Sequence, residues 1–319
     1  MTLLQSLLRL TNFQSPLLRT LVPSVSAAFA IQAAFAVPSV AARSERFYDF
    51  SGSLTYLAVT TLSLYLPAIR ARHAAGLTAS HTSLPSLLAP FTGPSALHWR
   101  QVVLSGAVAL WATRLGLYLF QRVLQDGSDS RFAAIKTSPP RFLAAFTAQA
   151  VWVSACLLPV VAVNAVPPAA LAARGPARPV EALGLALFAA GLALEVAADR
   201  QRARWVRDRR NKLHDDAFLT RGLWSRSRHP NYFGESTLWT GIATAAAGVL
   251  LARPAQLALG LGPFGTLCLC YASPAFVTFL LLKVSGVPLS ENKYDGLYGH
   301  RQDYQEWKRN TPMYIPKLF

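Results

Sequence analysis

Long apolar runs separated by short polar segments dominate the chain. Seven of these runs approach the roughly 20 residues that a helix needs to cross the apolar core of a bilayer. They cover residues 20–42, 52–69, 101–124, 143–165, 180–198, 236–252 and 256–283. We therefore predict an all-α, polytopic membrane protein with about seven transmembrane helices.

Proline residues mark where these runs are expected to break. Pro23 and Pro38 should interrupt the first run, and residues 253–254 should separate the last two runs as a tight hairpin. Residues 1–44 contain three arginines and no acid, which is typical of a targeting segment, but their apolar part is long for a cleaved signal. We expect a first span in this segment, followed by a membrane domain over residues 45–319.

Composition and charge agree with a membrane protein. Hydrophobic residues make up 52% of the chain and charged residues 14%, with a mean hydropathy of +0.30. The net charge of +16 is compatible with nucleic acid, an anionic membrane surface or a phosphate-bearing ligand, and the long uncharged runs argue against nucleic acid. With a cytoplasmic C-terminus, the inner segments 43–50, 122–141, 199–235 and 283–319 hold 22 of the 31 Lys and Arg residues, as the positive-inside rule expects.

Neither the cysteines nor the histidines form a metal-binding pattern. Cys156, Cys268 and Cys270 lie in apolar runs, so we expect buried thiols without a disulfide framework. The three histidines of residues 70–100 lack ligand spacing and lie in a stretch rich in Ser, Thr and Pro, which favours an exposed irregular loop. We predict no metal site.

Residues 195–235 form the longest polar stretch, and it begins inside an apolar run. Glu195 and Asp199 are four residues apart and therefore share one helix face. Six arginines follow between residues 200 and 210, which extends the predicted helix out of the membrane. These arginines are either a snorkelling, positive-inside helix end or the lining of a cytoplasmic pocket for phosphate groups, which the guanidinium fork binds well.

The segment SRHPNYFGE, residues 227–235, carries the densest chemistry of the chain. A proline costs no hydrogen bond at a helix start, so we expect a helix to begin near Asn231. Asn231, Glu235 and Trp239 would then share one stripe, which either recognises a nucleotide base or amide or forms a polar knot between helices. The aromatic-rich tail 287–316 is either an amphipathic surface helix or a lid over the pocket.

At these residues the chain resembles the steroid 5-alpha-reductase C-terminal domain superfamily, most closely its DUF1295 branch. The resemblance covers most of the chain after about residue 45. It rests on Gln149, Tyr304 and the segments 48–54, 114–120, 129–132, 195–201, 220–235 and 286–289. The shorter pattern RHPxYxG also occurs in isoprenylcysteine carboxyl methyltransferases and phospholipid methyltransferases.

The resemblance implies a membrane reductase that binds NADPH from the cytoplasmic side through its C-terminal half, about residues 180–319. The substrate class that it implies is a lipid or steroid-like molecule with a polarised carbon–carbon double bond. By local match, the implied cofactor contacts are Glu195, Asp199, Arg207, Arg228, His229, Asn231, Tyr232, Glu235, Trp239 and, on a looser match, Tyr294.

The substrate side departs from the superfamily pattern. Steroid reductases use a Glu in the second helix and a Tyr in the third, whereas here the second predicted span has no acid. Arg114 falls near the Tyr position with Tyr118 one turn on, so we predict these two as the catalytic groups. Two alternatives stay open: an S-adenosylmethionine-dependent lipid or isoprenylcysteine methyltransferase, and a non-catalytic relative. The resemblance favours the endoplasmic reticulum, and the acid-free N-terminus is also compatible with a mitochondrial membrane.

Overall fold

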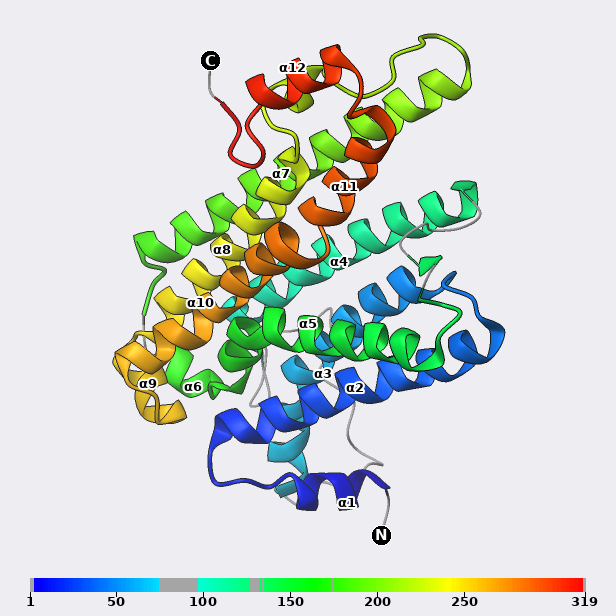
Figure 1. The fold of residues 1–319 in the computed structure, drawn as a ribbon. Helices are drawn as coiled ribbons and strands as arrows, with labels where there is room; N and C mark the ends of the chain where they lie inside the picture. Colours follow the sequence, from blue (N-terminus) through cyan, green and yellow to red (C-terminus); the bar gives the residue numbers. More distant parts are fainter. Residues whose placement is uncertain (1–2, 75–96, 127–131, 134, 174, 318–319) are drawn as a thin grey trace. The chain divides into compact units, whose positions relative to one another are not determined.

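The computed structural model describes residues 3–74, 97–126, 132–133, 135–173 and 175–317, and within these ranges every regular element is a helix (Figure 1). The elements are α1 (Leu3–Leu10), α2 (Pro16–Ala42), α3 (Tyr48–Ala74), α4 (Trp99–Asp126), α5 (Pro139–Ala165), α6 (Pro168–Ala172), α7 (Pro179–Arg210), η3 (Gly222–Ser225), α8 (Pro230–Leu250), α9 (Arg253–Leu259), α10 (Pro263–Phe279), η4 (Leu280–Val284), α11 (Val287–Tyr298) and α12 (Gln302–Asn310). The all-α prediction is confirmed. The loop expected within 70–100 falls mostly on residues 75–96, and the matched residues 129–131 also lie outside the described ranges.

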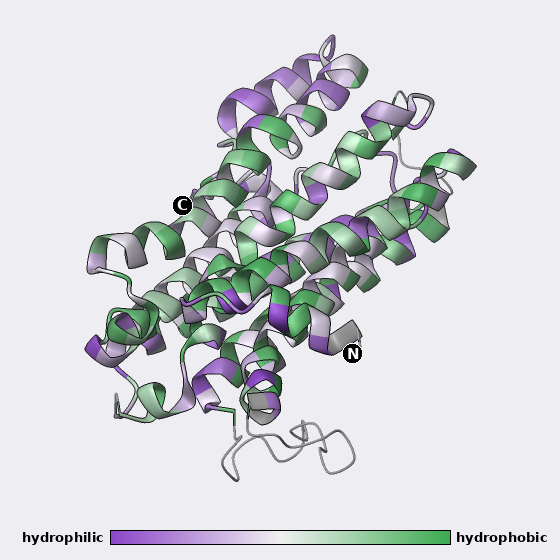
Figure 2. Cartoon of the chain, turned by 90° about the horizontal axis from the view of Figure 1, so that it is seen from below, coloured by the Kyte–Doolittle hydropathy of each residue, from purple (hydrophilic) through white to green (hydrophobic). Residues whose placement is uncertain are grey.

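Six helical stretches are long and apolar enough to cross a membrane, and a seventh results if the bent pair α8 and α9 counts as one span. Apolar turns cover most of the length of the long helices (Figure 2). Large apolar side chains such as Leu117 and Phe264 are exposed at 58% and 82%, as expected for surfaces that face lipid. The prediction of a polytopic integral membrane protein is confirmed.

The first span differs from its prediction, because α2 runs through both Pro23 and Pro38 without a break. A proline in a helix leaves the carbonyl four residues earlier without its usual donor. The Arg19 carbonyl, which Pro23 leaves without a donor, instead accepts from Arg70 Nη2 at 3.3 Å. The prolines therefore remain inside one 27-residue helix.

The last apolar run also differs from its prediction, because residues 256–283 are not one helix. α9 lies at 91° to α8, and α10 begins only at Pro263. Gly260 ends α9 with a φ of 67°, a conformation that glycine adopts without a steric penalty. The tight hairpin expected at residues 253–254 is therefore a wider turn that contains a short helix.

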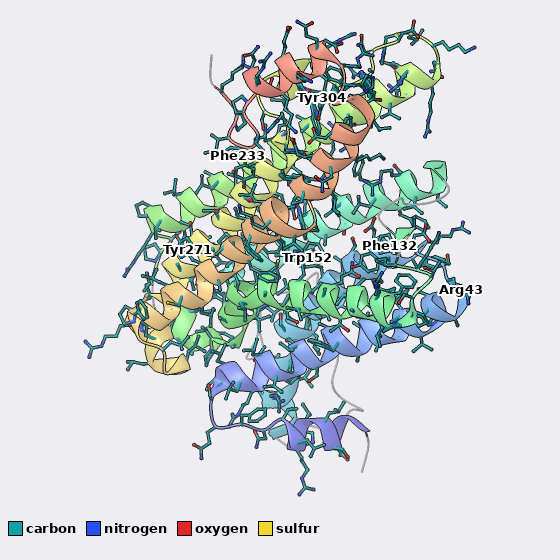
Figure 3. The ribbon with its side chains drawn as sticks, viewed as in Figure 1. Arg43, Phe132, Trp152, Phe233, Tyr271 and Tyr304 are labelled. Atoms are coloured by element: carbon teal, nitrogen blue, oxygen red, sulfur yellow. The ribbon has the colours of Figure 1, made fainter. Side chains whose placement is uncertain are left out.

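The chain divides into two compact units: a first unit of residues 1–182 and 243–273, and a second unit of residues 183–242 and 274–319. In the first unit, α2, α3, α4 and α5 pack against one another (Figure 1). Phe132, Phe142 and Phe146 form a buried aromatic core, with Phe132 labelled in Figure 3. The predicted cofactor half, 180–319, is shared between the two units.

Buried polar pairs fix the register of the first unit. Gln32 Nε2 donates to Thr55 Oγ1 at 2.8 Å between α2 and α3, and Arg100 Nε donates to Glu181 Oε2 at 2.7 Å. Both partners of the ion pair are at most 5% exposed, so removing either one would leave a buried charge without compensation. Cys156 and Cys270 are buried as expected, but Cys268 is exposed, because it lies on another face of α10 than Cys270.

The second unit is built on a very close contact between α7 and α8. A Cβ added to Gly191 would lie 2.4 Å from the Leu238 nitrogen, and one added to Gly241 would lie 2.3 Å from the Phe188 nitrogen. A Cβ on Gly234 would lie 2.7 Å from the Glu195 nitrogen. Small residues allow such an approach between membrane helices. This contact places the polar end of α7 directly beside the beginning of α8.

Candidate functional site

The SRHPNYFGE segment joins the C-terminal tail to the beginning of α8. Pro230 is the first residue of α8, which confirms the predicted helix start. Before it, the Arg228 backbone N–H donates to the Pro312 carbonyl at 2.9 Å, and Ser227 Oγ donates to the Tyr314 carbonyl at 2.8 Å. The tail is therefore hydrogen-bonded to the motif by backbone groups.

A pocket lies in the second unit where α7, the segment 218–229, α11 and α12 meet. Its lining consists of Arg202, Trp205, Phe218, Leu219, Trp224, Arg228, His229, Ser290, Glu291, Tyr294, Tyr304 and Trp307. The enclosed cavity is about 40 Å³, enough for a few water molecules, and the space reaches about 490 Å³ when the open mouth is included. In this arrangement the C-terminal tail closes the pocket.

Glu291 is the electrostatic centre of the pocket. Its carboxylate accepts from His229 Nε2 at 2.9 Å and pairs with Arg228 Nη1 at 3.3 Å and Lys308 Nζ at 2.9 Å. Lys308 also contacts Asp295 Oδ1 at 2.6 Å. Because an ionised carboxylate only accepts, Nε2 of His229 carries the proton in this pair.

Burial lowers the pKa of His229 below its ordinary value, although the hydrogen bond and the charge of Glu291 act in the opposite direction. Two nearby guanidinium groups, Arg228 and Arg202, lower this pKa further. His229 is therefore neutral near pH 7 and acts as a hydrogen-bond donor rather than as a cation.

Three buried N–H groups in the pocket lining lack a hydrogen-bond partner among the described residues: Trp205 Nε1, Arg228 Nε and Trp307 Nε1. Buried donors are normally satisfied, and one left without a partner carries its desolvation penalty. Three of them around one pocket indicate a place for a ligand that is rich in acceptor oxygens.

Aromatic side chains form most of the remaining wall. The Phe218 ring lies 5.2 Å from Tyr304 and 5.4 Å from Trp307, measured between centroids. Tyr304, labelled in Figure 3 on α12, is buried and donates through its hydroxyl to Asp295 Oδ1 at 2.9 Å. Trp224 is fixed to α7 because its Nε1 donates to the Ala198 carbonyl at 3.1 Å. These contacts present flat π-faces on which a ring system can stack.

The structure brings several of the predicted cofactor residues together. Asn231 Nδ2 donates to Asp199 Oδ1 at 3.4 Å, while the Asn231 Oδ1 atom is buried without a partner among the described residues. Tyr232 stacks on His229 with ring centroids 5.2 Å apart. Glu195 is buried beside Gly234.

The other predicted residues have different surroundings. Trp239 is completely buried in α8, and Glu235 is half-buried. Tyr294 lines the pocket from α11. The Arg207 side chain is 68% exposed beside Asp208 and is not part of the lining, which instead contains Arg202.

The two predicted catalytic residues lie in the first unit. Arg114 and Tyr118 are one turn apart on α4, and the Arg114 guanidinium carbon is 5.5 Å from the centre of the Tyr118 ring. The second predicted span starts earlier than expected, at Tyr48, and its first turn contains Asp49. Asp49 Oδ2 is 3.6 Å from Arg122 Nη2 on α4, so the second membrane helix does carry an acid.

Two features of the site were missed from the sequence, although both left a signal. Gly234 and Gly241 are seven residues apart on α8, as are Gly184 and Gly191 on α7, and this spacing is typical of a close helix contact. Arg202 continues the stripe of Glu195 and Asp199 three residues further along α7, whereas Arg207 does not.

Comparison with known proteins identifies a family. The family model DUF1295, described as a protein of unknown function, matches residues 77–311, which is well over half of the chain. No curated protein and no solved structure matches the chain. The chain therefore belongs to the DUF1295 family, which confirms the branch that the sequence motifs indicated.

Proposed function

We propose that this DUF1295 protein is a membrane-embedded, NADPH-dependent reductase of a carbon–carbon double bond in a lipid or steroid-like substrate. The observation that supports it most is the set of orphaned donors Trp205 Nε1, Arg228 Nε and Trp307 Nε1. Phosphate oxygens only accept hydrogen bonds, so a phosphate-bearing cofactor would satisfy these donors. Arg202 and Arg228 supply positive charge in the same lining.

The remaining chemistry of the pocket fits the other parts of such a cofactor. Base stacking on an aromatic side chain is worth about 1–3 kcal/mol, and Phe218, Tyr304 and Trp307 offer such faces. Asn231 is not part of the lining, but it follows the lining residue His229 by two positions, and its orphaned Oδ1 would accept from a carboxamide N–H. Asp199 accepts from the Asn231 amide nitrogen, which orients the amide so that this oxygen is available.

Binding requires the C-terminal tail to move. The enclosed cavity of about 40 Å³ is far smaller than the range of roughly 300–1,000 Å³ that is typical of small-molecule sites. Glu291 holds the tail closed through Arg228, His229 and Lys308. The tail therefore acts as a lid that opens when a cofactor enters.

When bound, the nicotinamide supplies a hydride, and the protein contributes binding, orientation and charge stabilisation. In the first unit, the Arg114 guanidinium would stabilise the negative charge that develops on the substrate oxygen. Tyr118, beside it, would donate the proton that completes the reduction. Asp49 lies on α3, which packs against α4, and its carboxylate pairs with Arg122 of α4.

A second candidate is an S-adenosylmethionine-dependent methyltransferase of lipid or isoprenyl substrates, and one observation favours it. Glu291 already neutralises Arg228 and stands among aromatic side chains such as Tyr294 and Trp307. A carboxylate with aromatic faces suits a sulfonium cation.

Tryptophan fluorescence distinguishes the candidates, because Trp205, Trp224 and Trp307 line the pocket. The protein in mild detergent is titrated with NADPH and, separately, with S-adenosylmethionine. A reductase is expected to show saturable quenching by NADPH alone. Quenching by S-adenosylmethionine alone would replace the proposal with the second candidate, and quenching by neither would indicate a non-catalytic relative.

Arginine variants sharpen the same titration. Arg202→Ala should weaken NADPH binding about tenfold, since a hydrogen bond to a charged group contributes about 1.5–3 kcal/mol. Arg207→Ala is the matched control, because this exposed side chain lies on the same helix outside the lining. Equal effects of the two variants would contradict the assignment of the pocket.

A further inference from the structure

A second cavity, of about 550 Å³, lies in the first unit. Its walls come from α1, the beginning of α2, the end of α3, the beginning of α4 and the junction of α5 with α6. Interiors normally pack to nearly the density of organic crystals and contain few voids larger than a water molecule. A cavity of this size is within the range of sites that enclose one drug-sized ligand.

The walls of this cavity are mainly apolar. Leu8, Leu64 and Leu97 are buried around it, and Pro67 and Ala68 continue the apolar surface along α3. Apolar cavities exclude water and accept apolar ligands, because a water molecule needs two to four polar partners. The chemistry of the walls therefore suits a hydrocarbon chain.

Among the described residues of the lining, the charged side chains are arginines. Arg9, Arg19 and Arg70 contribute to it together with His73, and none of the described lining residues is Asp or Glu. The three arginines lie near the ends of their helices. The cavity thus has an apolar body and a positively charged rim.

Arg70 organises this rim. Its Nη1 donates to the Leu8 carbonyl at 2.9 Å, and its Nη2 donates to the Thr11 carbonyl at 3.2 Å and to the Arg19 carbonyl at 3.3 Å. These bonds tie the segment between α1 and α2 to the end of α3. The Arg70 Nε atom is buried and has no partner among the described residues. One donor of a fixed guanidinium is therefore left for a ligand.

We propose that this cavity binds a single-chain anionic lipid, specifically a long-chain carboxylate. The carboxylate would accept hydrogen bonds from the arginine rim and compensate its charge, and the alkyl chain would fill the apolar body along α3. A cavity of drug-sized volume suits one chain with a small head rather than a two-chain phospholipid. This site is independent of the reductase proposal, because its described lining contains neither Arg114 nor Tyr118 and no residue of the second unit.

The test uses a diazirine-bearing C18 carboxylate as a photoaffinity probe on the full-length protein in mild detergent. Peptide mass spectrometry should locate the label on α1, the beginning of α2 or the end of α3. Oleate should compete with the probe, whereas oleyl alcohol, which has the same chain without the charge, should not. If inorganic phosphate or oleyl alcohol competed as strongly as oleate, the proposal would be overturned.

Variants test the two parts of the site separately. Arg19→Gln should reduce labelling about tenfold, the amount expected for one hydrogen bond to a charged group. Arg46→Gln is the matched control, an exposed arginine of the same unit outside the cavity. Ala68→Phe should abolish labelling by filling the apolar body. Unchanged labelling of both Arg19→Gln and Ala68→Phe, in variants that melt cooperatively near the wild-type temperature, would refute the assignment.

Discussion

Substituting Gly234 with alanine tests the contact that aligns the candidate cofactor residues. The new Cβ would lie 2.7 Å from the Glu195 nitrogen and 2.8 Å from the Gly191 oxygen. Ordinary van der Waals contacts of a Cβ begin near 3.4 Å, so α7 and α8 must separate by about 0.7 Å. Both neighbours are backbone atoms, so no rotation of a side chain relieves the clash.

The size of the effect follows from two opposing contributions. Overpacking by one methyl group costs about 1–3 kcal/mol, whereas alanine gains about 1 kcal/mol over glycine in a helix interior. The expected net loss is about 1–2 kcal/mol, which lowers the melting temperature by about 2–8 °C for a protein of this size. Gly296→Ala is the matched control in α11, because its Cβ would meet nothing within 4 Å. It should leave the melting temperature unchanged or slightly raised.

The same substitution should disturb the site. Asn231 precedes Gly234 by about one turn, and Asp199 follows Glu195 by one turn, so separating the helices lengthens the 3.4 Å hydrogen bond between Asn231 and Asp199. Thermal unfolding in detergent, followed by tryptophan fluorescence, measures the stability, and NADPH titration measures the site. If Gly234→Ala melted as high as Gly296→Ala and bound NADPH equally well, the close contact would be refuted.

Three further predictions concern the pocket of the second unit. Burial lowers the pKa of His229, with Arg228 and Arg202 acting in the same direction and Glu291 against it, so below about pH 6.5 the unfolded chain takes up the proton before the folded chain does. The melting temperature should therefore fall as the pH is lowered from about 7.5 to about 5.5, and His229→Gln should flatten this slope; an equal slope in the variant would contradict the lowered pKa. Glu291→Gln should lower the NADPH Kd about three- to tenfold by weakening the competing ion pair, and a higher Kd would disprove this competition. Asn231→Ala should raise the NADPH Kd about tenfold, and an unchanged Kd would remove the amide from the site.

The spans could be predicted from the sequence because hydropathy over about 20 residues reflects a single requirement, burial of the backbone in hydrocarbon. The beginning of α8 at Pro230 was predictable for a similar reason, since it depends on local chemistry alone. The continuity of α2 through Pro23 was not, because it depends on the partners that surrounding groups offer to the freed carbonyls. The turn at α9 depends on the positive φ of Gly260, which composition alone does not specify.

The candidate site was predictable in its chemistry and less so in its membership. Asn231 and Asp199 were both predicted as cofactor contacts, and the structure joins them by a hydrogen bond. The choice of Arg202 over Arg207 follows from helical phase rather than from charge, because Arg202 continues the stripe of Glu195 and Asp199 along α7. The contribution of Trp307 depends on how the tail folds back, a long-range event without a local sequence signal.

The charge balance of the pocket links the identity of the ligand to the movement of α11. Arg228, His229 and Lys308 all contact the Glu291 carboxylate. A phosphate can reach these donors only by displacing the carboxylate, because both groups accept hydrogen bonds and repel each other. Since Asp295 lies one turn from Glu291 and shares Lys308, displacing the carboxylate also loosens α11. Binding of NADPH should therefore increase amide hydrogen exchange in residues 287–298, and unchanged or slower exchange there would refute this competition.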